Sequence, residues 1–247
     1  MLNAQFFTDT GQHREKNEDA GGIFYNQTHQ QLLVLCDGMG GHKAGEVASQ
    51  FVTNQLRDYF ETENFIELDQ AESWLSKTLK DINLELFEYA TTNEEYHGMG
   101  TTCVCALIFD NKIVVANIGD SRAYVINSRE IEQITYDHSF VNHLLMTGQI
   151  TEEEAFNHPQ RNIITKVMGT DRRVSPDIFT KRISYYNYLL LNSDGLSDYV
   201  RNHEIETLMN QSTSLNELGE ALIQAALDHQ SKDNVSVLLA EIEGNNV

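Results

Sequence analysis

The amino-acid sequence predicts an α+β domain in which helices flank packed, mostly antiparallel β-sheets. Two observations support this fold class. Short runs rich in Val, Ile, Leu and Tyr are joined by turn residues, and the helical periodicities are grouped along the chain. A doubly wound parallel sheet would instead need a crossover, usually a helix, between its successive strands.

The predicted strands are apolar runs bounded by polar residues, as buried and half-buried strands require. They are Gln31–Cys36, Thr102–Phe109, Lys112–Asn117, Ala123–Ile126, Tyr188–Asn192 and Asn234–Ile242. Hairpin turns are predicted at Asp110-Asn111 and at Ser128-Arg129.

Three stretches carry apolar residues at the spacing of one helical face. Their stripes run from Val47 to Tyr59, from Leu75 to Tyr89 and from Leu215 to Ala226. The third is preceded by the capping-box pattern Ser214-x-x-Glu217, and Thr151-x-x-Glu154 predicts a shorter helix in the same way.

The composition predicts a single domain over residues 1–247, because no Pro/Gly/Ser-rich linker or repeat divides a chain with only two prolines. The 37 acidic and 17 basic side chains give a net charge of −20, which argues against a nucleic-acid or anionic-membrane partner. The first residues have no signal-peptide pattern, and no apolar run approaches membrane-spanning length. We expect a monomer without membrane insertion.

The three cysteines indicate a cytoplasmic protein. Cys36, Cys103 and Cys105 are odd in number and lie in apolar runs, so we expect them to be reduced core residues.

The stretch LCDGMGGHKAGE at 35–46 places an acid and a glycine-rich loop between a predicted strand and a predicted helix. It is not a nucleotide phosphate loop, because Lys43 is followed by Ala44 where that pattern needs Ser or Thr, and the glycine spacing does not fit the dinucleotide pattern. Asp37 at a strand end suggests a cation site, with Gly38 letting a main-chain carbonyl approach the ion. A tight turn with a solvated Asp37 is the alternative.

Carboxylates recur at the ends of the predicted strands. They are Asp19, Asp37, Asp120, Asp194 and Asp233. Any one of them alone is more often a turn residue than a ligand, but packed sheets bring their strand ends to one rim, where clustered acids repel unless a cation lies between them. Oxygen ligands without His or Cys favour Mg²⁺ or Mn²⁺ over zinc, and no EF-hand calcium loop is present.

An ordered set of motifs spans nearly the whole chain. It consists of Arg14-x-x-Asn-Glu-Asp19, Asp37-Gly-Met-Gly-Gly-His42-x-x-Gly-Glu46, Gly100-Thr-Thr102, Gly119-Asp-Ser-Arg122, Ser193-Asp-Gly-Leu-Ser-Asp198 and Asp233-Asn234. By these motifs the chain resembles the metal-dependent Ser/Thr protein phosphatases of the 2C type, in particular their compact bacterial members. The stretch from Asp137 to Gly169 resembles the family's flap, at about 138–168, and the strand that follows it.

The resemblance implies a four-layer α-β-β-α sandwich with a binuclear Mn²⁺ or Mg²⁺ site at one rim. It makes Asp37 the bridging ligand and the carbonyl of Gly38 a ligand of the second ion. Asp194 and Asp233 would complete the protein ligands of the first ion.

The resemblance also implies an outer shell and a further, weaker ion. Asp19 and Glu18 would hold metal-bound waters. We expect a third ion at Asp120 and Asp194, with Asp198 as a direct or outer ligand, because three carboxylates meeting there would raise one another's pKa. The alternative makes Asp120 a hairpin-corner residue whose side chain caps the turn.

Two ions of this kind would lower the pKa of a shared water and provide a hydroxide for in-line attack on phosphorus. A covalent phosphoenzyme is not expected. The cysteine-phosphatase pattern C-x₅-R is absent, since His42 lies six residues after Cys36 and Phe109 six residues after Cys103, and no D-x-D nucleophile pair occurs.

Arg14 is the candidate phosphate clamp, because a guanidinium presents a planar fork to two phosphate oxygens; a solvated surface Arg is the alternative. His42 is the candidate general acid for the leaving Ser or Thr oxygen, and its alternative is a loop histidine that bonds the main chain. The other eight histidines are expected on the surface or in packing.

The predicted function is therefore metal-dependent hydrolysis of phosphoserine and phosphothreonine in proteins. The resemblance implies a bacterial membrane Ser/Thr kinase as the opposing enzyme and its phosphorylated clients as substrates. Two alternatives share the fold. A phosphoprotein-binding pseudophosphatase should lack some of the metal acids, all of which are present, and a hydrolase of small phosphoesters would use the same site.

Overall fold

Two antiparallel sheets form the centre of the computed structural model, which describes residues 2–40 and 44–242. One sheet has the order β1 (Asn3–Asp9), β11 (Val235–Glu241), β10 (Tyr188–Asn192), β7 (Arg122–Ile126) and β8 (Ile131–Gln133). The other has the order β2 (Asp19–Tyr25), β3 (Gln31–Met39), β5 (Cys103–Ile108), β6 (Lys112–Ile118) and β9 (Asp177–Arg182), and β4 (Gly100–Thr101) pairs with the end of β3. Both predicted hairpins, β5–β6 and β7–β8, are present.

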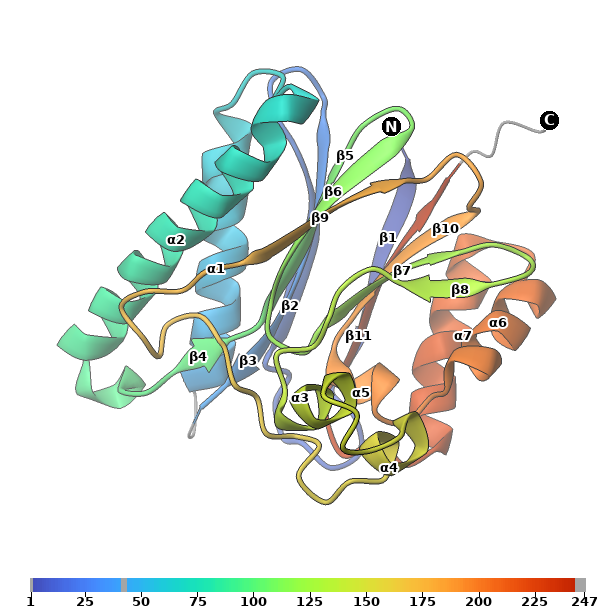
Figure 1. Ribbon diagram of the computed structural model, residues 1–247. Helices are drawn as coiled ribbons and strands as arrows, with labels where there is room; N and C mark the ends of the chain where they lie inside the picture. Colours follow the sequence, from blue (N-terminus) through green and yellow to red (C-terminus); the bar gives the residue numbers. More distant parts are fainter. Residues whose placement is uncertain (1, 41–43, 243–247) are drawn as a thin grey trace.

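Helices cover the outer face of each sheet, which confirms the α-β-β-α sandwich (Figure 1). On the β3 sheet lie α1 (Ala44–Glu61) and α2 (Leu68–Thr92), and the short η1 (Glu94–Tyr96) follows α2. On the β10 sheet lie α5 (Asp194–Ser197), α6 (Asn202–Gln211) and α7 (Leu215–Asp228). None of the helices in the described part of the chain has the length and apolarity that crossing a membrane requires.

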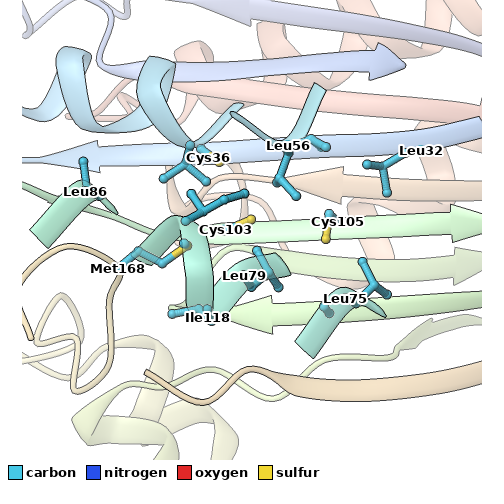
Figure 2. Packing of buried hydrophobic residues seen from close by; sticks show 14 of the residues in the cluster. Leu32, Cys36, Leu56, Leu75, Leu79, Leu86, Cys103, Cys105, Ile118 and Met168 are labelled. Atoms are coloured by element: carbon cyan, nitrogen blue, oxygen red, sulfur yellow. The ribbon is translucent and has the colours of Figure 1, made fainter. Parts of the chain in front are cut away.

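Alternation along the strands produces the layers. In β3, Leu32 and Cys36 belong to the core under α1 and α2, whereas Leu33 and Leu35 belong to the core between the two sheets. Figure 2 shows Leu32 and Cys36 on the side of the sheet where Leu56 of α1 packs. A third core lies between the β10 sheet and α5 to α7.

The cysteines are free thiols in the core, as predicted. Cys36, Cys103 and Cys105 are all buried and unpaired, and Figure 2 shows the three on neighbouring strands.

The sequence did not predict β1, β2, β8 and β9, which contain polar or glycine residues and are only partly buried. These strands owe their conformation to their partners in the sheets. In β2, a Cβ at Gly21 would lie 2.6 Å from the ring of Phe6 in β1, so the glycine makes room for that ring.

The two capping boxes differ. At α4 (Glu152–Phe156) the Thr151 side chain accepts from the Glu154 N–H, and the Glu154 carboxylate accepts from the Thr151 N–H. At α7 the Ser214 hydroxyl caps the helix, but the Glu217 carboxylate accepts from the main chain of Thr213 at 2.7 Å. The return hydrogen bond of this capping box therefore comes from the N–H of Thr213 and not, as predicted, from that of Ser214.

The predicted flap, residues 138–168, is a loop closed at its base. It contains α3 (Phe140–Met146) and α4 and lies at one end of the sandwich (Figure 1). At its base, the Thr165 N–H donates to the His138 carbonyl at 2.7 Å, and the Phe140 N–H donates to the Ile163 carbonyl at 2.9 Å. The prediction of a strand directly after the flap is wrong. Met168 makes only an isolated bridge, and the next strand is β9.

Candidate metal centre

The predicted strand-end acids lie at one rim of the sandwich. Asp19 begins β2, Asp37 lies near the end of β3, Asp120 lies in the β6–β7 turn, Asp194 begins α5 directly after β10, and Asp233 precedes β11. Their charges interact: Asp19, Asp194, Asp233 and Asp120 all contribute, after burial, to raising the pKa of Asp37 well above its ordinary value. The strand ends converge because the two sheets pack face to face.

Strand β3 does not end at Asp37, as the sequence suggested, but continues to Met39. Gly38 pairs there with Thr101 of β4. The Asp37 N–H donates to the Thr102 hydroxyl at 2.9 Å, and the Asp37 carbonyl accepts from the Thr102 N–H and the Thr101 hydroxyl, each at 2.9 Å. Thr101 and Thr102 thus fix the main chain of Asp37.

Gly38 lies where two other main-chain segments meet. A Cβ at Gly38 would stand 2.1 Å from the carbonyl oxygen of Gly45 and 2.6 Å from that of Glu18. The Gly38 N–H also donates to the Glu18 carbonyl at 3.1 Å. A glycine is therefore required here by packing alone.

Glu18 and Asp19 are held from the neighbouring strands. The Glu18 N–H donates to the Asn234 side chain at 2.8 Å, and the Ser193 hydroxyl donates to Asp19 Oδ2 at 2.9 Å. Burial raises the pKa of Asp19 to about 6 and also raises that of Glu18. Asp19 pairs directly with Asp37 across the sheet, and the carbonyl of Glu18 accepts from the N–H of the next residue, Gly38.

A second group of acids lies beside the flap. Burial, together with the charges of Asp137 and Asp198, raises the pKa of Asp120 to about 7. Burial, Asp120 and Asp198 raise the pKa of Asp194 well above its ordinary value, and burial raises that of Asp198. The three residues proposed for the weaker ion are therefore electrostatic neighbours.

Asp137 is a member of this group that sequence reasoning missed. Arg122 donates to it from Nε at 3.0 Å and from Nη2 at 2.7 Å, so its charge is paired. Its position in the Asp137-His-Ser motif at the start of the flap was the only sequence feature that could have identified it.

Two arginines contact the candidate ligands. Arg14 Nη2 lies 2.7 Å from Asp233 Oδ2, and the Arg14 side chain is 45% exposed. Arg161 of the flap donates from Nε to Asp198 Oδ2 at 3.0 Å. Arg14 thus stands at the rim, open to an incoming anion.

The candidate general acid, His42, lies outside the described residues, and its role stays a prediction.

The donors fit a hard divalent cation. Buried carboxylate oxygens without a hydrogen-bond partner in the described structure occur on Asp19, Asp120 and Asp194, in each case Oδ1. Such atoms are costly unless a cation binds them. Within residues 2–40 and 44–242, no three His, Cys, Asp or Glu side chains are close enough to enclose an ion as they stand.

The two roles predicted for Asp120, metal ligand and turn cap, stay predictions. Asp120 Oδ1 is buried without a hydrogen-bond partner in the part of the chain that the structure describes, whereas a bond from the main chain of Asp120 itself acts to lower the pKa of this carboxyl.

The chain is similar to known proteins over nearly its whole length. Residues 11–239 match the family model for protein phosphatase 2C. The serine/threonine phosphatase stp of Listeria monocytogenes is 39% identical over 241 residues, which are 97% of this chain and 96% of that protein. The crystal structure of the serine/threonine phosphatase Stp1 from Staphylococcus aureus is 70% identical with a TM-score of 0.97, and the match covers 99% of this chain and 96% of that one.

A structure with bound metal is also similar. The catalytic domain of the serine/threonine protein phosphatase PstP, in complex with two manganese ions, is 34% identical with a TM-score of 0.83 and 97% coverage of both chains. From the match to the family model and these full-length similarities, the chain belongs to the protein phosphatase 2C family of metal-dependent Ser/Thr protein phosphatases.

Proposed function

We propose that the acidic rim is the catalytic centre at which this chain hydrolyses phosphoserine and phosphothreonine in proteins. The observation that carries the proposal is the set of buried, unpartnered carboxylate oxygens on Asp19, Asp120 and Asp194, which come from three different elements of the fold. Asp37 and the Gly38 carbonyl would hold the Mn²⁺ or Mg²⁺ pair.

In this proposal the other acids differ in how directly they contact the ions. Asp194 and Asp233 complete the ligands of the pair, and Asp19 and Glu18 orient water next to it. Asp120 and Asp198, together with Asp194, hold a weaker third ion. When bound, the metal pair lowers the pKa of a water molecule and so supplies the nucleophile at neutral pH.

Arg14 binds the substrate phosphate. Its guanidinium is anchored to Asp233 through Nη2 and to the Lys232 carbonyl through Nε, which leaves Nη1 for the phosphate. The anchoring orients the planar group beside the metal ligands, and its charge offsets that of the incoming phosphate. His42 would protonate the leaving oxygen.

The substrate chain has room beside the flap. A cavity of about 480 Å³ is lined by Asp120 and Asp194 on one side and by flap residues such as Asn142, Phe156 and Arg161 on the other. This space next to the acids can hold residues that flank the phosphorylated side chain of a protein substrate.

We infer further that the substrates are phosphorylated cytoplasmic proteins and that a membrane Ser/Thr kinase is the opposing enzyme, with the phosphatase acting as a monomer. The three free, buried cysteines support a reducing compartment. Deleting the gene for this chain should raise the phosphorylation of a set of host proteins. Removing the kinase should lower the phosphorylation of the same set. If the two deletions affected different proteins, the inference would be contradicted.

The direct test is phosphate release from a phosphothreonine peptide with Mn²⁺, compared with an aryl phosphate. We expect turnover of the peptide that stops with a chelator and returns with Mn²⁺. Binding without turnover would indicate a pseudophosphatase, and turnover of the aryl phosphate alone would indicate a small-molecule hydrolase.

A further inference from the structure

His138, at the start of the flap, makes two hydrogen bonds with one residue of the Asp120 turn. The His138 N–H donates to the Gly119 carbonyl at 2.9 Å, and the Gly119 N–H donates to His138 Nδ1 at 2.9 Å. Both polar main-chain groups of Gly119 are thereby bonded to a single flap residue. The His138 side chain is only 11% exposed, so water competes little for these contacts.

The contact with Gly119 assigns the tautomer of the ring. Because Nδ1 accepts an N–H, the proton of the neutral ring is on Nε2. His138 Nε2 lies 3.3 Å from Asp177 Oδ2, and Lys166 Nζ donates to Asp177 Oδ1 at 3.0 Å. With this tautomer the Nε2–H side of the ring faces a carboxylate at the start of β9, and Nδ1 accepts from the Asp120 turn.

Lys166 lies at the other end of the flap, so this cluster joins both flap ends to the sheet. Its Nζ donates to Asp177 Oδ1 at 3.0 Å and stands 2.9 Å from His138 Nε2. Because the Gly119 N–H has a fixed direction and already uses Nδ1 as its acceptor, this Lys166–His138 contact joins two donors, and the Asp177 carboxylate beside both offsets their repulsion. The main chain closes the same neck through the bond from Thr165 to His138.

The Asp120 carboxylate depends on its main chain for its position. Its Oδ1 has no hydrogen-bond partner in the described structure. The turn is held on one side by His138 and on the other by Thr102, whose hydroxyl lies 2.7 Å from the Ser121 hydroxyl. Gly119 has a φ of +113° and a Cβ there would stand 2.6 Å from Thr102, so the turn has little freedom to shift toward Thr102.

We propose that His138 is a positioning residue: its imidazole ties the Gly119–Asp120 turn to the base of the flap and thereby sets where the Asp120 carboxylate stands relative to Asp194. The inference rests on the proposed role of Asp120 in a weak metal site. It makes the geometry of that site depend on the flap through one side chain.

The test compares two substitutions, each of which replaces one of the two ring nitrogens of His138 by an amide group at a similar distance from the main chain. His138→Asn places a carbonyl oxygen near Nδ1 and can still accept from Gly119, whereas His138→Gln reaches toward Asp177 and loses the Gly119 contact. His143→Asn, at an exposed position on α3, is the matched control.

We expect His138→Gln to weaken the weakest Mn²⁺ site about tenfold and to lower kcat on a phosphopeptide by a similar factor, with KM changing less. His138→Asn should stay within about threefold of the wild type. In metal-free protein the Gly119 amide resonance should move upfield in the Gln variant and stay near its wild-type position in the Asn variant. Equal losses in both variants would overturn the inference.

Two measurements on the wild type keep the tests separate. Side-chain ¹⁵N spectra should show the His138 proton on Nε2. A proton on Nδ1 would overturn the role of His138. Because this measurement uses the wild type, it stands even if a variant fails to fold. Mn²⁺ titration should show a weak site beyond the tight pair. Its absence would overturn the role of Asp120, whereas a Gly119 amide identical in all variants would overturn that of His138.

Discussion

Asp19 and Asp37 face each other as a cross-strand pair in the antiparallel register of β2 and β3. Both side chains lie on the same face of the sheet at directly opposed positions, where like charges are unfavourable. Burial is the largest cause of the raised pKa of each residue, and the charge of Asp19 is the next cause for Asp37. Two acids in this position are tolerated when a cation shares them.

This pair predicts how the stability of the metal-free protein depends on pH. The pKa of Asp19 rises from its ordinary 3.8 to about 6 in the folded state, so between these values the folded protein binds more protons than the unfolded one. Stability from this group is therefore lost as pH rises through that window. Thermal unfolding in chelator should show Asp19→Asn gaining melting temperature over the wild type at pH 7.5 and not at pH 4.5.

Mn²⁺ binding should offset the loss of stability that the charged carboxylates cause at neutral pH. Its stabilisation should be large at pH 7.5, about 2.7 kcal/mol at a hundredfold excess over Kd, and small at pH 4.5, where protons compete for the carboxylates. An equal shift of melting temperature at both pH values would contradict binding at these acids.

Asp37→Asn should separate stability from catalysis. Removing one charge from the cluster relieves repulsion with Asp19 and Asp194, so the metal-free variant should melt at or above the wild-type temperature at pH 8. Its phosphopeptide turnover should fall at least about a hundredfold, because one carboxylate would serve both ions. The control is Asp81→Asn on the exposed face of α2, and near-normal kcat at low Mn²⁺ would refute the bridging role.

Arg14→Ala should raise KM for a phosphopeptide about tenfold, and lower kcat as well if the contact tightens in the transition state. Arg14→Lys should fall between, since it keeps the charge and loses the planar fork. Steady-state kinetics would show this, with Arg57→Ala, another partly exposed paired arginine, as control. If the substitution changed the Mn²⁺ affinity but not KM, the role of Arg14 would be to hold Asp233 and not to bind the phosphate.

Asp120→Asn should lower phosphopeptide activity without destabilising the protein. The pKa of Asp120 is about 7 in the folded state because the residue is buried near Asp137 and Asp198, so above that pH its charge destabilises the metal-free fold. The variant should therefore melt higher than the wild type at pH 8 and bind one weak Mn²⁺ fewer. A lower melting temperature with unchanged metal stoichiometry would support the turn-capping role.

The sequence by itself determined the parts of this protein that depend on local pattern. The central strands such as β5 and β10 are continuous apolar runs, and the long helices α1, α2 and α7 repeat apolar residues at helical spacing, so these could be predicted within a few residues, whereas α3, α5 and α6 were not predicted. The acids could be assigned to strand ends for the same reason, and the order of the motifs identified the family.

Only the tertiary structure decided which of these residues meet. Arg14 bonds Asp233, 219 positions later, and Asp19 stands opposite Asp37, because sheet register and the packing of two sheets bring them together. The contact of His138 with Gly119 depends in the same way on the flap closing onto the β6–β7 turn. Local pattern fixes which face of a strand a side chain occupies, whereas its neighbour from a distant segment is selected by the burial and hydrogen bonding of the whole fold.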